Sequence, residues 1–298
     1  MESLHRQVAP TTERQDMSLR EIPVFYCESM VANIESFSPS AGKPRDVVHS
    51  WQALGIPLNV QQPIRVSLEQ FSLAHDPDYV KAVLACEEPN GFGNRSPEVA
   101  ASLPLTTGAM LSAANAAIEN GLVAVAPCSG FHHAGFDYGY GFCTFNGLVV
   151  VVEVLRAAAE PKRVGILDCD LHFGDGTVQI LKTLGRQDDV PHYTAGEHLL
   201  YARQAEDFLK QLPGLMDQFR NCDVLLYQAG ADPHIDDPFE GWMTTEQMEK
   251  RDLIVFETAK AMGLPIAWNL AGGYQTPLRR VLDIHDNTLK ACAKIYLE

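Results

Sequence analysis

Apolar and polar positions along the chain alternate between short, uniformly apolar runs and longer amphipathic stretches. The apolar runs predict strands at Val24–Cys27, Val123–Ala126, Arg163–Asp170, Val224–Gln228 and Pro265–Leu270. The runs VGIL, VLLYQ and PIAWNL within them are apolar on both faces, which is typical of strands buried in a parallel sheet. The alternation of such strands with helical stretches predicts one α/β domain with a mainly parallel sheet.

The amphipathic stretches predict the helices, and polar, glycine-rich stretches predict the loops. We expect helices over Val47–Leu54, Pro77–Cys86, Leu105–Asn120, Phe145–Ala159, Leu199–Phe219 and Pro277–Ile295, and loops over Glu88–Pro97 and Ser129–Phe142. The first 21 residues are polar and contain no apolar signal-peptide core. We therefore expect a flexible leader at residues 1–21 and the folded domain at residues 22–298.

Composition and charge exclude several classes of partner. The chain has 298 residues, of which 38 are acidic and 23 basic, giving a net charge of −15, and 46% are hydrophobic. A surface with this negative charge repels nucleic acids and anionic membranes. The sequence contains no run of Lys and Arg that would form a basic patch. No apolar run is long enough to span a membrane. Seven cysteines without a CxxC pair indicate free thiols in a reducing compartment, so we expect a cytoplasmic protein.

The first chemical cluster, DCDLHFGDG, directly follows the VGIL strand. While the chain stays extended, Asp168, Asp170 and His172 point to one side, and two carboxylates with an imidazole suit a metal such as zinc. The alternative is an acidic loop that caps the next helix, with Asp175 near its N-terminus.

Three further clusters follow other predicted strands. His132 and His133 lie on a glycine-rich loop and suit proton transfer or metal binding, or they are a surface pair. The segment ADPHIDDP is either a turn or a source of metal ligands. Its spacing does not show which of Asp232, Asp236 and Asp237 would be a ligand. Tyr274 follows Gly-Gly and either donates a hydrogen bond to an oxyanion or packs over a tight turn. Together the four clusters predict an open metal site with acid–base histidines and a phenol.

The order of these motifs resembles the zinc-dependent histone deacetylase family, including its bacterial amidohydrolases and the acetylpolyamine amidohydrolases. The resemblance rests on FHHAGFDYGYGFCTFN, ILDCDLHFGDG, QAGADPHIDDP and LAGGY, with HDPDYV and NGFG upstream, and covers the chain from about Val24 to its end. It implies the arginase/deacetylase fold, a single three-layer α/β/α domain around a mainly parallel sheet, and hydrolysis of an acyl amide.

The resemblance also implies two ions. By position in the motifs, Asp170, His172 and Asp237 would hold one catalytic Zn²⁺. A structural K⁺ would lie beside it, held largely by main-chain oxygens around Asp168, Asp170 and His172, with Thr194 as a further candidate.

Roles for the other site residues follow from the same resemblance. His133 would be the general base and then acid, with Asp175 as its carboxylate partner. His132 would be an electrostatic partner oriented by Asp168, and Tyr274 would polarise the scissile carbonyl. The tunnel for the N-acylated substrate would be lined by Gly141 and Phe142.

Two departures from the family pattern concern the substrate. Arg95 stands where peptide-binding members often carry an acidic residue, which predicts a preference for anionic substrates, unless Arg95 is only a solvated surface residue. After Thr194 the chain lacks a long Phe- and Gly-rich loop, so one wall of the site is either missing or supplied by a partner subunit of a homo-oligomer. The main function predicted is deacylation of acyl-lysine or a related N-acyl amine. The alternatives are an amidohydrolase of small N-acyl metabolites or acetylpolyamines, and a non-catalytic zinc-binding sensor of acyl ligands.

Overall fold

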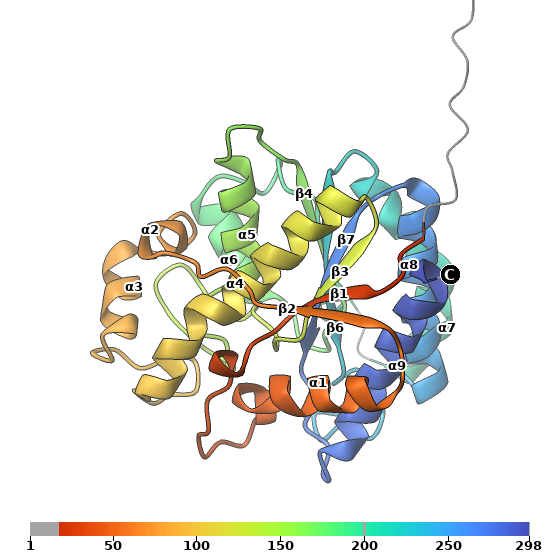
Figure 1. The fold of residues 1–298 in the computed structure, drawn as a ribbon, viewed down its shortest axis with the longest axis horizontal. Helices are drawn as coiled ribbons and strands as arrows, with labels where there is room; N and C mark the ends of the chain where they lie inside the picture. Colours follow the sequence, from red (N-terminus) through yellow and green to blue (C-terminus); the bar gives the residue numbers. More distant parts are fainter. Residues whose placement is uncertain (1–17, 199–200, 298) are drawn as a thin grey trace, which may run out of the picture.

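One parallel sheet of seven strands organises the computed structural model, which describes residues 18–198 and 201–297 (Figure 1). The strand order is β2-β1-β3-β7-β6-β4-β5, and every neighbouring pair is parallel. The strands are β1 Ile22–Phe25, β2 Leu58–Gln61, β3 Val123–Ala126, β4 Val164–Asp168, β5 His192–Thr194, β6 Val224–Gly230 and β7 Ile266–Ala271. The predicted α/β fold with a parallel sheet is confirmed.

Helices cover both faces of the sheet and give the three layers. They are α1 Lys43–Ala53, α2 Leu68–Phe71, α3 Pro77–Leu84, α4 Pro97–Asn120, α5 Gly147–Arg156, α6 Asp175–Thr183, α7 Ala205–Leu215, α8 Thr245–Met262 and α9 Arg279–Tyr296. The core on one face joins α4, α5 and α6, and the core on the other joins α1, α7, α8 and α9. Figure 1 shows these two groups of helices on opposite sides of the strands.

Alternation along each strand divides its side chains between the two cores. Val123 and Val125 of β3 pack with α1 and α9, whereas Ala124 and Ala126 pack with α4. In β6, Leu225 and Tyr227 face the helices α1, α7, α8 and α9, whereas Val224 and Leu226 face α4, α5 and α6. Both faces of a central strand are therefore apolar, which explains the continuous hydrophobic runs in the sequence.

Several predicted boundaries differ from the structure. The helix expected from Leu105 begins eight residues earlier at Pro97, where Ser96 caps it, and it continues through Pro104. The stretch expected as one helix over Leu199–Phe219, of which residues 199–200 lie outside the described residues, is divided into a 3-10 turn at Ala202–Gln204, α7, and a second 3-10 turn at Met216–Phe219. Strand β2 was not predicted, because its side chains are mostly exposed and it carries no apolar run.

The described N-terminal residues approach the end of the chain. The main-chain N–H of Leu19 donates to the Tyr296 carbonyl at 2.7 Å, and Leu19 forms a parallel bridge with Leu297. Most of the leader predicted at 1–21 lies outside the described residues. Within residues 18–198 and 201–297, no helix combines the length and the apolar character needed to cross a bilayer.

Candidate active site

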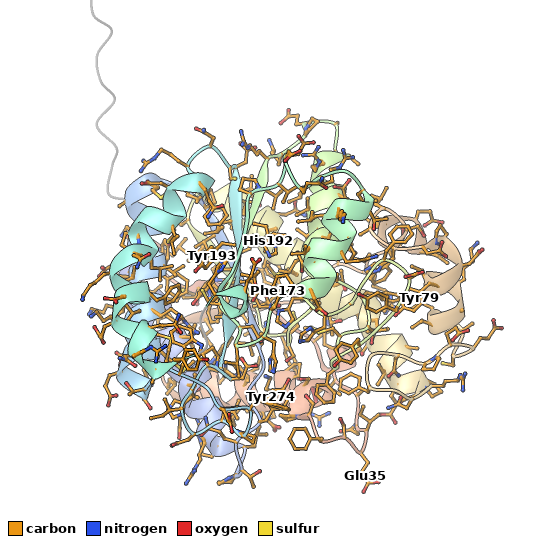
Figure 2. The ribbon with its side chains drawn as sticks, turned by 180° about the vertical axis from the view of Figure 1, so that it is seen from behind. Glu35, Tyr79, Phe173, His192, Tyr193 and Tyr274 are labelled. Carbon is orange, nitrogen blue, oxygen red and sulfur yellow. The ribbon has the colours of Figure 1, made fainter. Side chains whose placement is uncertain are left out.

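The polar clusters of the sequence follow the carboxyl ends of four neighbouring strands, β3, β7, β6 and β4. Parallel pairing sets Asp168 of β4 beside Gln228 of β6, and Gln228 beside Asn269 of β7. The segments that follow these strands therefore leave the sheet at one edge, where ligand sites of open parallel sheets lie. In the side-chain view, Tyr274 and Glu35 lie at the same end of the molecule (Figure 2).

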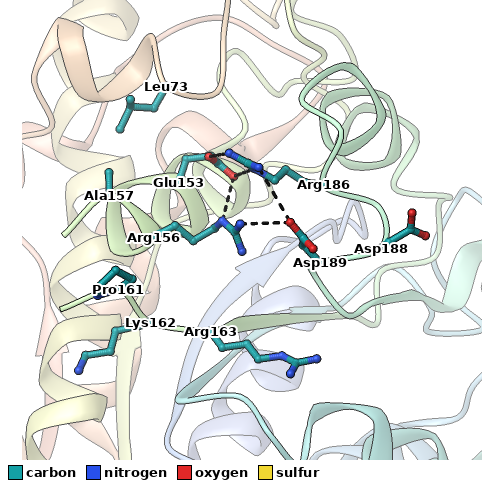
Figure 3. Close-up of a pocket in the computed structure, with 10 residues that line it drawn as sticks. All are labelled: Leu73, Glu153, Arg156, Ala157, Pro161, Lys162, Arg163, Arg186, Asp188 and Asp189. Atoms are coloured by element: carbon teal, nitrogen blue, oxygen red, sulfur yellow. Dashed lines mark hydrogen bonds and ion pairs between the residues drawn. The ribbon is translucent and has the colours of Figure 1, made fainter. Parts of the chain in front are cut away.

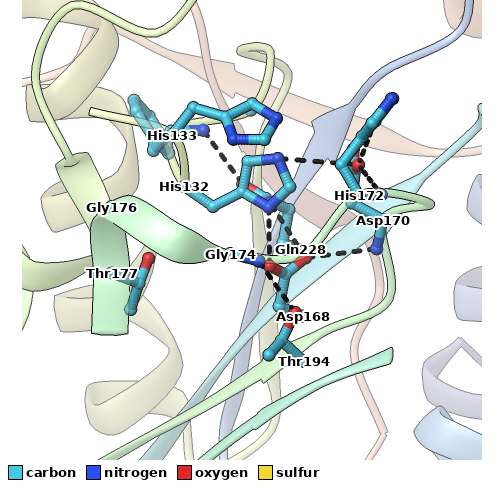
Figure 4. Close-up of polar contacts among 12 residues, drawn as sticks. His132, His133, Asp168, Asp170, His172, Gly174, Gly176, Thr177, Thr194 and Gln228 are labelled. Carbon is cyan, nitrogen blue, oxygen red and sulfur yellow. Dashed lines mark hydrogen bonds and ion pairs between the residues drawn. The ribbon is translucent and has the colours of Figure 1, made fainter. Parts of the chain in front are cut away.

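His132 is buried between two carboxylates (Figure 4). Its Nδ1 is 2.7 Å from Oδ2 of Asp168, and its Nε2 is 3.5 Å from Oδ1 of Asp170. Burial lowers the pKa of His132, but the charges on Asp168, Asp170 and Asp232 outweigh burial and raise the pKa to about 9. The three surrounding carboxylates therefore favour the protonated form of His132.

His133 lies beside His132 but faces a different environment, with ring centroids 4.2 Å apart. Its Nδ1 is 2.7 Å from Oδ1 of Asp175, the first residue of α6. Burial lowers the pKa of His133, the charge on His132 lowers it further, and Asp175 opposes both. The net lowering of its pKa favours the neutral imidazole, which is the state a general base requires.

Gly141 packs directly on the ring of His133. A Cβ at this position would lie 2.5 Å from Cδ2 of His133, and the φ of Gly141 is +55°. A larger residue would push the imidazole away from Asp175, so this part of the glycine-rich loop has to be glycine.

Among the described residues, Asp170, His172 and Asp232 form a group of side chains that could hold a metal ion. One possible ligand atom from each lies within 4.8 Å of the other two. Nδ1 of His172 is 3.1 Å from Oδ2 of Asp232 and 3.3 Å from Oδ1 of Asp170. Burial lowers the pKa of His172, but hydrogen bonds to both carboxylates raise it to about 10. A metal ion would take the place of the proton that Nδ1 shares with these carboxylates.

Asp237, the ligand expected from the resemblance, is not a member of this group of three. Its Oδ1 accepts from the N–H of Phe239 at 3.1 Å and its Oδ2 accepts from the N–H of Tyr274 at 2.8 Å. The pKa of Asp237 is raised, because burial and the charge on Asp170 outweigh the two N–H groups and the charge on His172, which lower it. Asp237 thus borders the metal group, and Asp232 and Asp237 are both candidates for the third ligand.

Tyr274 is positioned by β7 and by the two glycines that follow it. Gly272 and Gly273 have φ values of +51° and +89°, so the chain turns sharply and directs Tyr274 toward the carboxylates. Burial raises the pKa of Tyr274 well above its usual range, and Asp232 and Asp170 raise it further. The phenol is therefore protonated at neutral pH and able to donate a hydrogen bond.

One pocket gathers most of the predicted residues. Its lining comprises Ser40, Ser129, Gly130, His132, His133, Gly141, Phe142, Cys143, Asp170, His172, Gly272 and Tyr274. Asp168 and Asp175 support the two histidines by hydrogen bonds at their Nδ1 atoms. Arg95 is not part of this lining. Its Nε donates to the Glu87 carbonyl at 3.0 Å, within the loop that precedes α4.

Lys43 and Gln228 also belong to the site, although no motif in the sequence identified them. Lys43 begins α1 and is completely buried, with Nζ donating to the Gly272 carbonyl. Burial lowers the pKa of Lys43 to about 8, although Asp232, Asp170 and Asp237 favour its charged form. Gln228 links two strand ends, because its Oε1 accepts from the N–H of Phe131 at 3.0 Å and its Nε2 donates to Asp168 at 2.9 Å.

A larger hollow of about 700 Å³ lies away from this pocket, between the ends of α5 and α6 (Figure 3). Four of its charged side chains pair with one another: Arg186 binds Glu153 at 3.1 Å, and Arg156 binds Asp189 at 3.3 Å. The other three, Lys162, Arg163 and Asp188, lie apart from these pairs in Figure 3. Such a mutually neutralised ion-pair network offers no convergent set of reactive groups. The smaller pocket at the strand ends is therefore the candidate active site.

Comparisons with known proteins identify the family and the fold. The sequence profile of the histone deacetylase domain matches residues 40–195, just over half of the chain. An uncharacterised protein of Picosynechococcus is 28% identical over 275 residues, covering 80% of this chain and 87% of that protein. A probable deacetylase of Methanothermobacter thermautotrophicus is 22% identical over 280 residues, covering 81% and 82%.

Solved structures share the fold. An acetylpolyamine aminohydrolase from Burkholderia pseudomallei superposes with a TM-score of 0.70 at 17% identity, over 92% of this chain and 99% of that one. The HD domain of HDA15 superposes with a TM-score of 0.75 at 17% identity, over 94% and 91%. With the matched domain and the geometry of the strand-end pocket, these findings show that the chain belongs to the histone deacetylase family of hydrolases.

Proposed function

We propose that the protein is a zinc-dependent deacylase that hydrolyses the amide bond of an acyl-lysine or a related N-acyl amine. The observation that carries this proposal is the meeting of three kinds of group in one pocket: two carboxylate-paired histidines, an Asp/His/Asp metal group and a protonated tyrosine. This combination suits hydrolysis of an unactivated acyl amide.

The donor set suits zinc. Carboxylate oxygens and an imidazole nitrogen are ligands that zinc accepts, and three protein ligands leave a position open for a small molecule. Asp170 and His172 would hold the ion, with Asp237 from the resemblance or Asp232 from the geometry as the third ligand. Bound zinc would lower the pKa of a water molecule and polarise the acyl oxygen.

The chain's own residues would divide the remaining work. His133 would accept a proton at Nε2 and later deliver one to the leaving amine, while Asp175 fixes its Nδ1 side. His132 would contribute positive charge, oriented by Asp168. The hydroxyl of Tyr274 would donate to the developing oxyanion, a contribution of roughly 3–4 kcal/mol for a good donor.

Other parts of the sequence prediction belong to the same proposal. Gly141 and Phe142 would line the substrate tunnel, and Arg95 would favour an anionic group near the acylated amine. A structural K⁺ would lie near Asp168, Asp170 and His172, and Thr194 would take part. We further propose a catalytic domain at 22–298 after a leader at 1–21. The seven cysteines are free, which is consistent with a cytoplasmic location.

A turnover screen tests the proposal. Zinc-loaded protein would be offered acyl-lysine peptides of several acyl lengths, acetylpolyamines and small carboxylate-bearing N-acyl amides, each with and without a chelator. We expect at least one class to be hydrolysed, chelation to abolish the activity, and Tyr274→Phe to lower kcat about 100-fold. Inactivity on all substrates with zinc bound would contradict deacylation and favour the binding-protein alternative.

Metal binding by two matched variants identifies the third ligand. Asp232→Asn and Asp237→Asn each replace one carboxylate by an isosteric amide, and zinc affinity would be measured by competition with a chromogenic chelator. We expect the ligand's variant to lose at least about 100-fold in affinity, and the other to lose no more than about 10- to 100-fold, typical of a supporting residue. Unchanged affinity in both variants would contradict the proposed metal site.

A further inference from the structure

The loop of residues 131–146 carries His132 and His133 but has little regular structure of its own. It contains no helix, and its only bridge joins Tyr140 to Cys143. Phe142 has a φ of +65°, in a region that residues other than glycine rarely adopt. Backbone of this kind keeps its shape only where surrounding groups hold it. The position of His133 therefore depends on contacts from outside the loop.

His75, which opens the HDPDYV motif, joins two parts of this loop. It is completely buried between α2 and α3. Its Nε2 lies 2.9 Å from the main-chain nitrogen of Asn146, whose N–H can only donate, so Nε2 is the unprotonated ring nitrogen. Nδ1 therefore carries the proton and donates to the Gly135 carbonyl at 2.9 Å. Burial lowers the pKa of His75 to about 4, so the ring keeps this tautomer at neutral pH.

Two other residues of the HDPDYV motif bind the same loop. The main-chain N–H of Asp76 donates to the Phe136 carbonyl at 2.9 Å, and the hydroxyl of Tyr79 donates to the Thr144 carbonyl at 2.9 Å. Because Asp76 also caps α3, these groups are fixed to a helix. We call His75, Asp76 and Tyr79 the loop clamp. None of the three lines the strand-end pocket.

Helix α6 holds the other side of the loop. Its first residue, Asp175, binds Nδ1 of His133. Thr177, which lies on the same helix (Figure 4), donates from its main-chain N–H to the His132 carbonyl at 3.0 Å. The hydroxyl of Thr177 accepts from the side chain of Asn146 at 2.9 Å. The residue at the end of the loop is therefore bound both by the loop clamp and by the helix that carries the partner of His133.

We infer that His75 is a positioning residue for His133. Its two hydrogen bonds hold the segment after His133 at a fixed distance from Asn146, and so hold the imidazole against Asp175. The inference deepens the proposed function and rests on it for the role of His133 as the base. His75 is neither a candidate metal ligand nor part of the pocket lining, so its loss should displace the base without removing a ligand.

Two variants of His75 test this role. Phenylalanine keeps a ring and removes both hydrogen bonds, whereas the carboxamide of glutamine offers one donor and one acceptor. We expect kcat to fall about 10- to 100-fold in His75→Phe, with a smaller change in KM and an unchanged zinc affinity, because a displaced catalytic group slows the chemical step. His75→Gln should recover part of kcat. Wild-type kcat in His75→Phe would overturn the positioning role.

His285→Phe is the matched control. His285 is also completely buried, and neither of its ring nitrogens has a hydrogen-bond partner among the described residues. The same substitution there removes a buried imidazole without releasing the loop, so kcat should stay at the wild-type value. A loss of kcat equal to that of His75→Phe would show that any buried histidine has this effect and would overturn the inference.

Hydrogen exchange read by mass spectrometry tests the loop clamp without turnover. In zinc-loaded His75→Phe we expect the amides of residues 131–146 to exchange at least about tenfold faster than in the wild type, with β6 and β7 unchanged. Tyr79→Phe removes only the bond to Thr144, should give a smaller increase in the same loop, and carries the test if His75→Phe does not fold. Unchanged exchange in the loop would overturn the inference. Faster exchange in a protein whose wild type hydrolyses no substrate would contradict the proposed function while supporting the loop clamp.

Discussion

At the scale of single residues, His132 and His133 show that neighbours in sequence can have opposite electrostatics. The pKa of His132 is raised because Asp168, Asp170 and Asp232 outweigh the effect of its burial. The pKa of His133 is lowered because burial and the charge on His132 outweigh Asp175. Divergent pKa values in adjacent groups are typical of acid–base sites, and here the two pKa values shift in opposite directions.

Asp175→Asn should shift the pH dependence of catalysis. The Asp175 carboxylate raises the pKa of His133, so its removal lowers this pKa further. Since His133 must be unprotonated to accept a proton, the acidic limb of kcat/KM should move to lower pH, by about one unit, while the maximal rate falls because His133 loses its orienting partner. The measurement is kcat/KM between about pH 4.5 and 8. Asp207→Asn, at an exposed position on α7, is the control, and an acidic limb that moves upward would contradict the assignment.

At the scale of elements, α4 contains two residues that usually interrupt helices, and both pack against the segment before α2. The carbonyl of Pro104 accepts the N–H of Val66 at 3.0 Å. Gly108 lies so close to Ile64 that a Cβ would be 1.8 Å from its carbonyl oxygen. The sequence prediction began this helix at Leu105, directly after Pro104, a residue that helix interiors usually exclude. The contacts that keep the helix continuous come from a distant segment.

Gly108→Ala should therefore destabilise the protein although alanine favours helices. The added methyl group would force α4 away from the Ile64 main chain, at a cost of about 3 kcal/mol. Gly214→Ala is the matched control: Gly214 lies in α7 with no atom within 4 Å of an added Cβ, and the change should stabilise by roughly 0.5–1 kcal/mol. Urea unfolding of both variants measures the difference. A Gly108→Ala protein with an unchanged free energy of unfolding would contradict the prediction that α4 has no room for a side chain next to the Ile64 main chain.

At the scale of the whole molecule, the net charge of −15 and the contact proposed above for Arg95 would act on substrates in opposite ways. The net charge produces a field that attracts cations over a distance set by salt, whereas Arg95 would act only on contact. Long-range attraction should therefore govern encounter rates, and contact with Arg95 should govern the ranking of bound substrates.

Ionic strength separates these two effects. Raising it from about 0.02 M to about 0.2 M shortens the Debye length about threefold. We expect kcat/KM for an acetylpolyamine to fall several-fold and kcat/KM for a carboxylate-bearing amide to stay constant or rise. The comparison is made at constant pH with one enzyme preparation. A rise for the cationic substrate would contradict steering by the acidic surface.

The sequence by itself determined the fold class and most of the residues around the pocket. Uniformly apolar strands require a sheet covered on both faces, and parallel strands place the segments after them at one edge, so the histidines, Asp170, His172 and Tyr274 had to meet. Only the tertiary structure decided the position of Asp232 beside His172, the burial of Lys43 under Gly272 and the hydrogen bonds of His75 to the loop of residues 131–146. These contacts join segments far apart in the chain, and their geometry depends on how helices and loops pack around the sheet, which local periodicity and motif spacing do not encode.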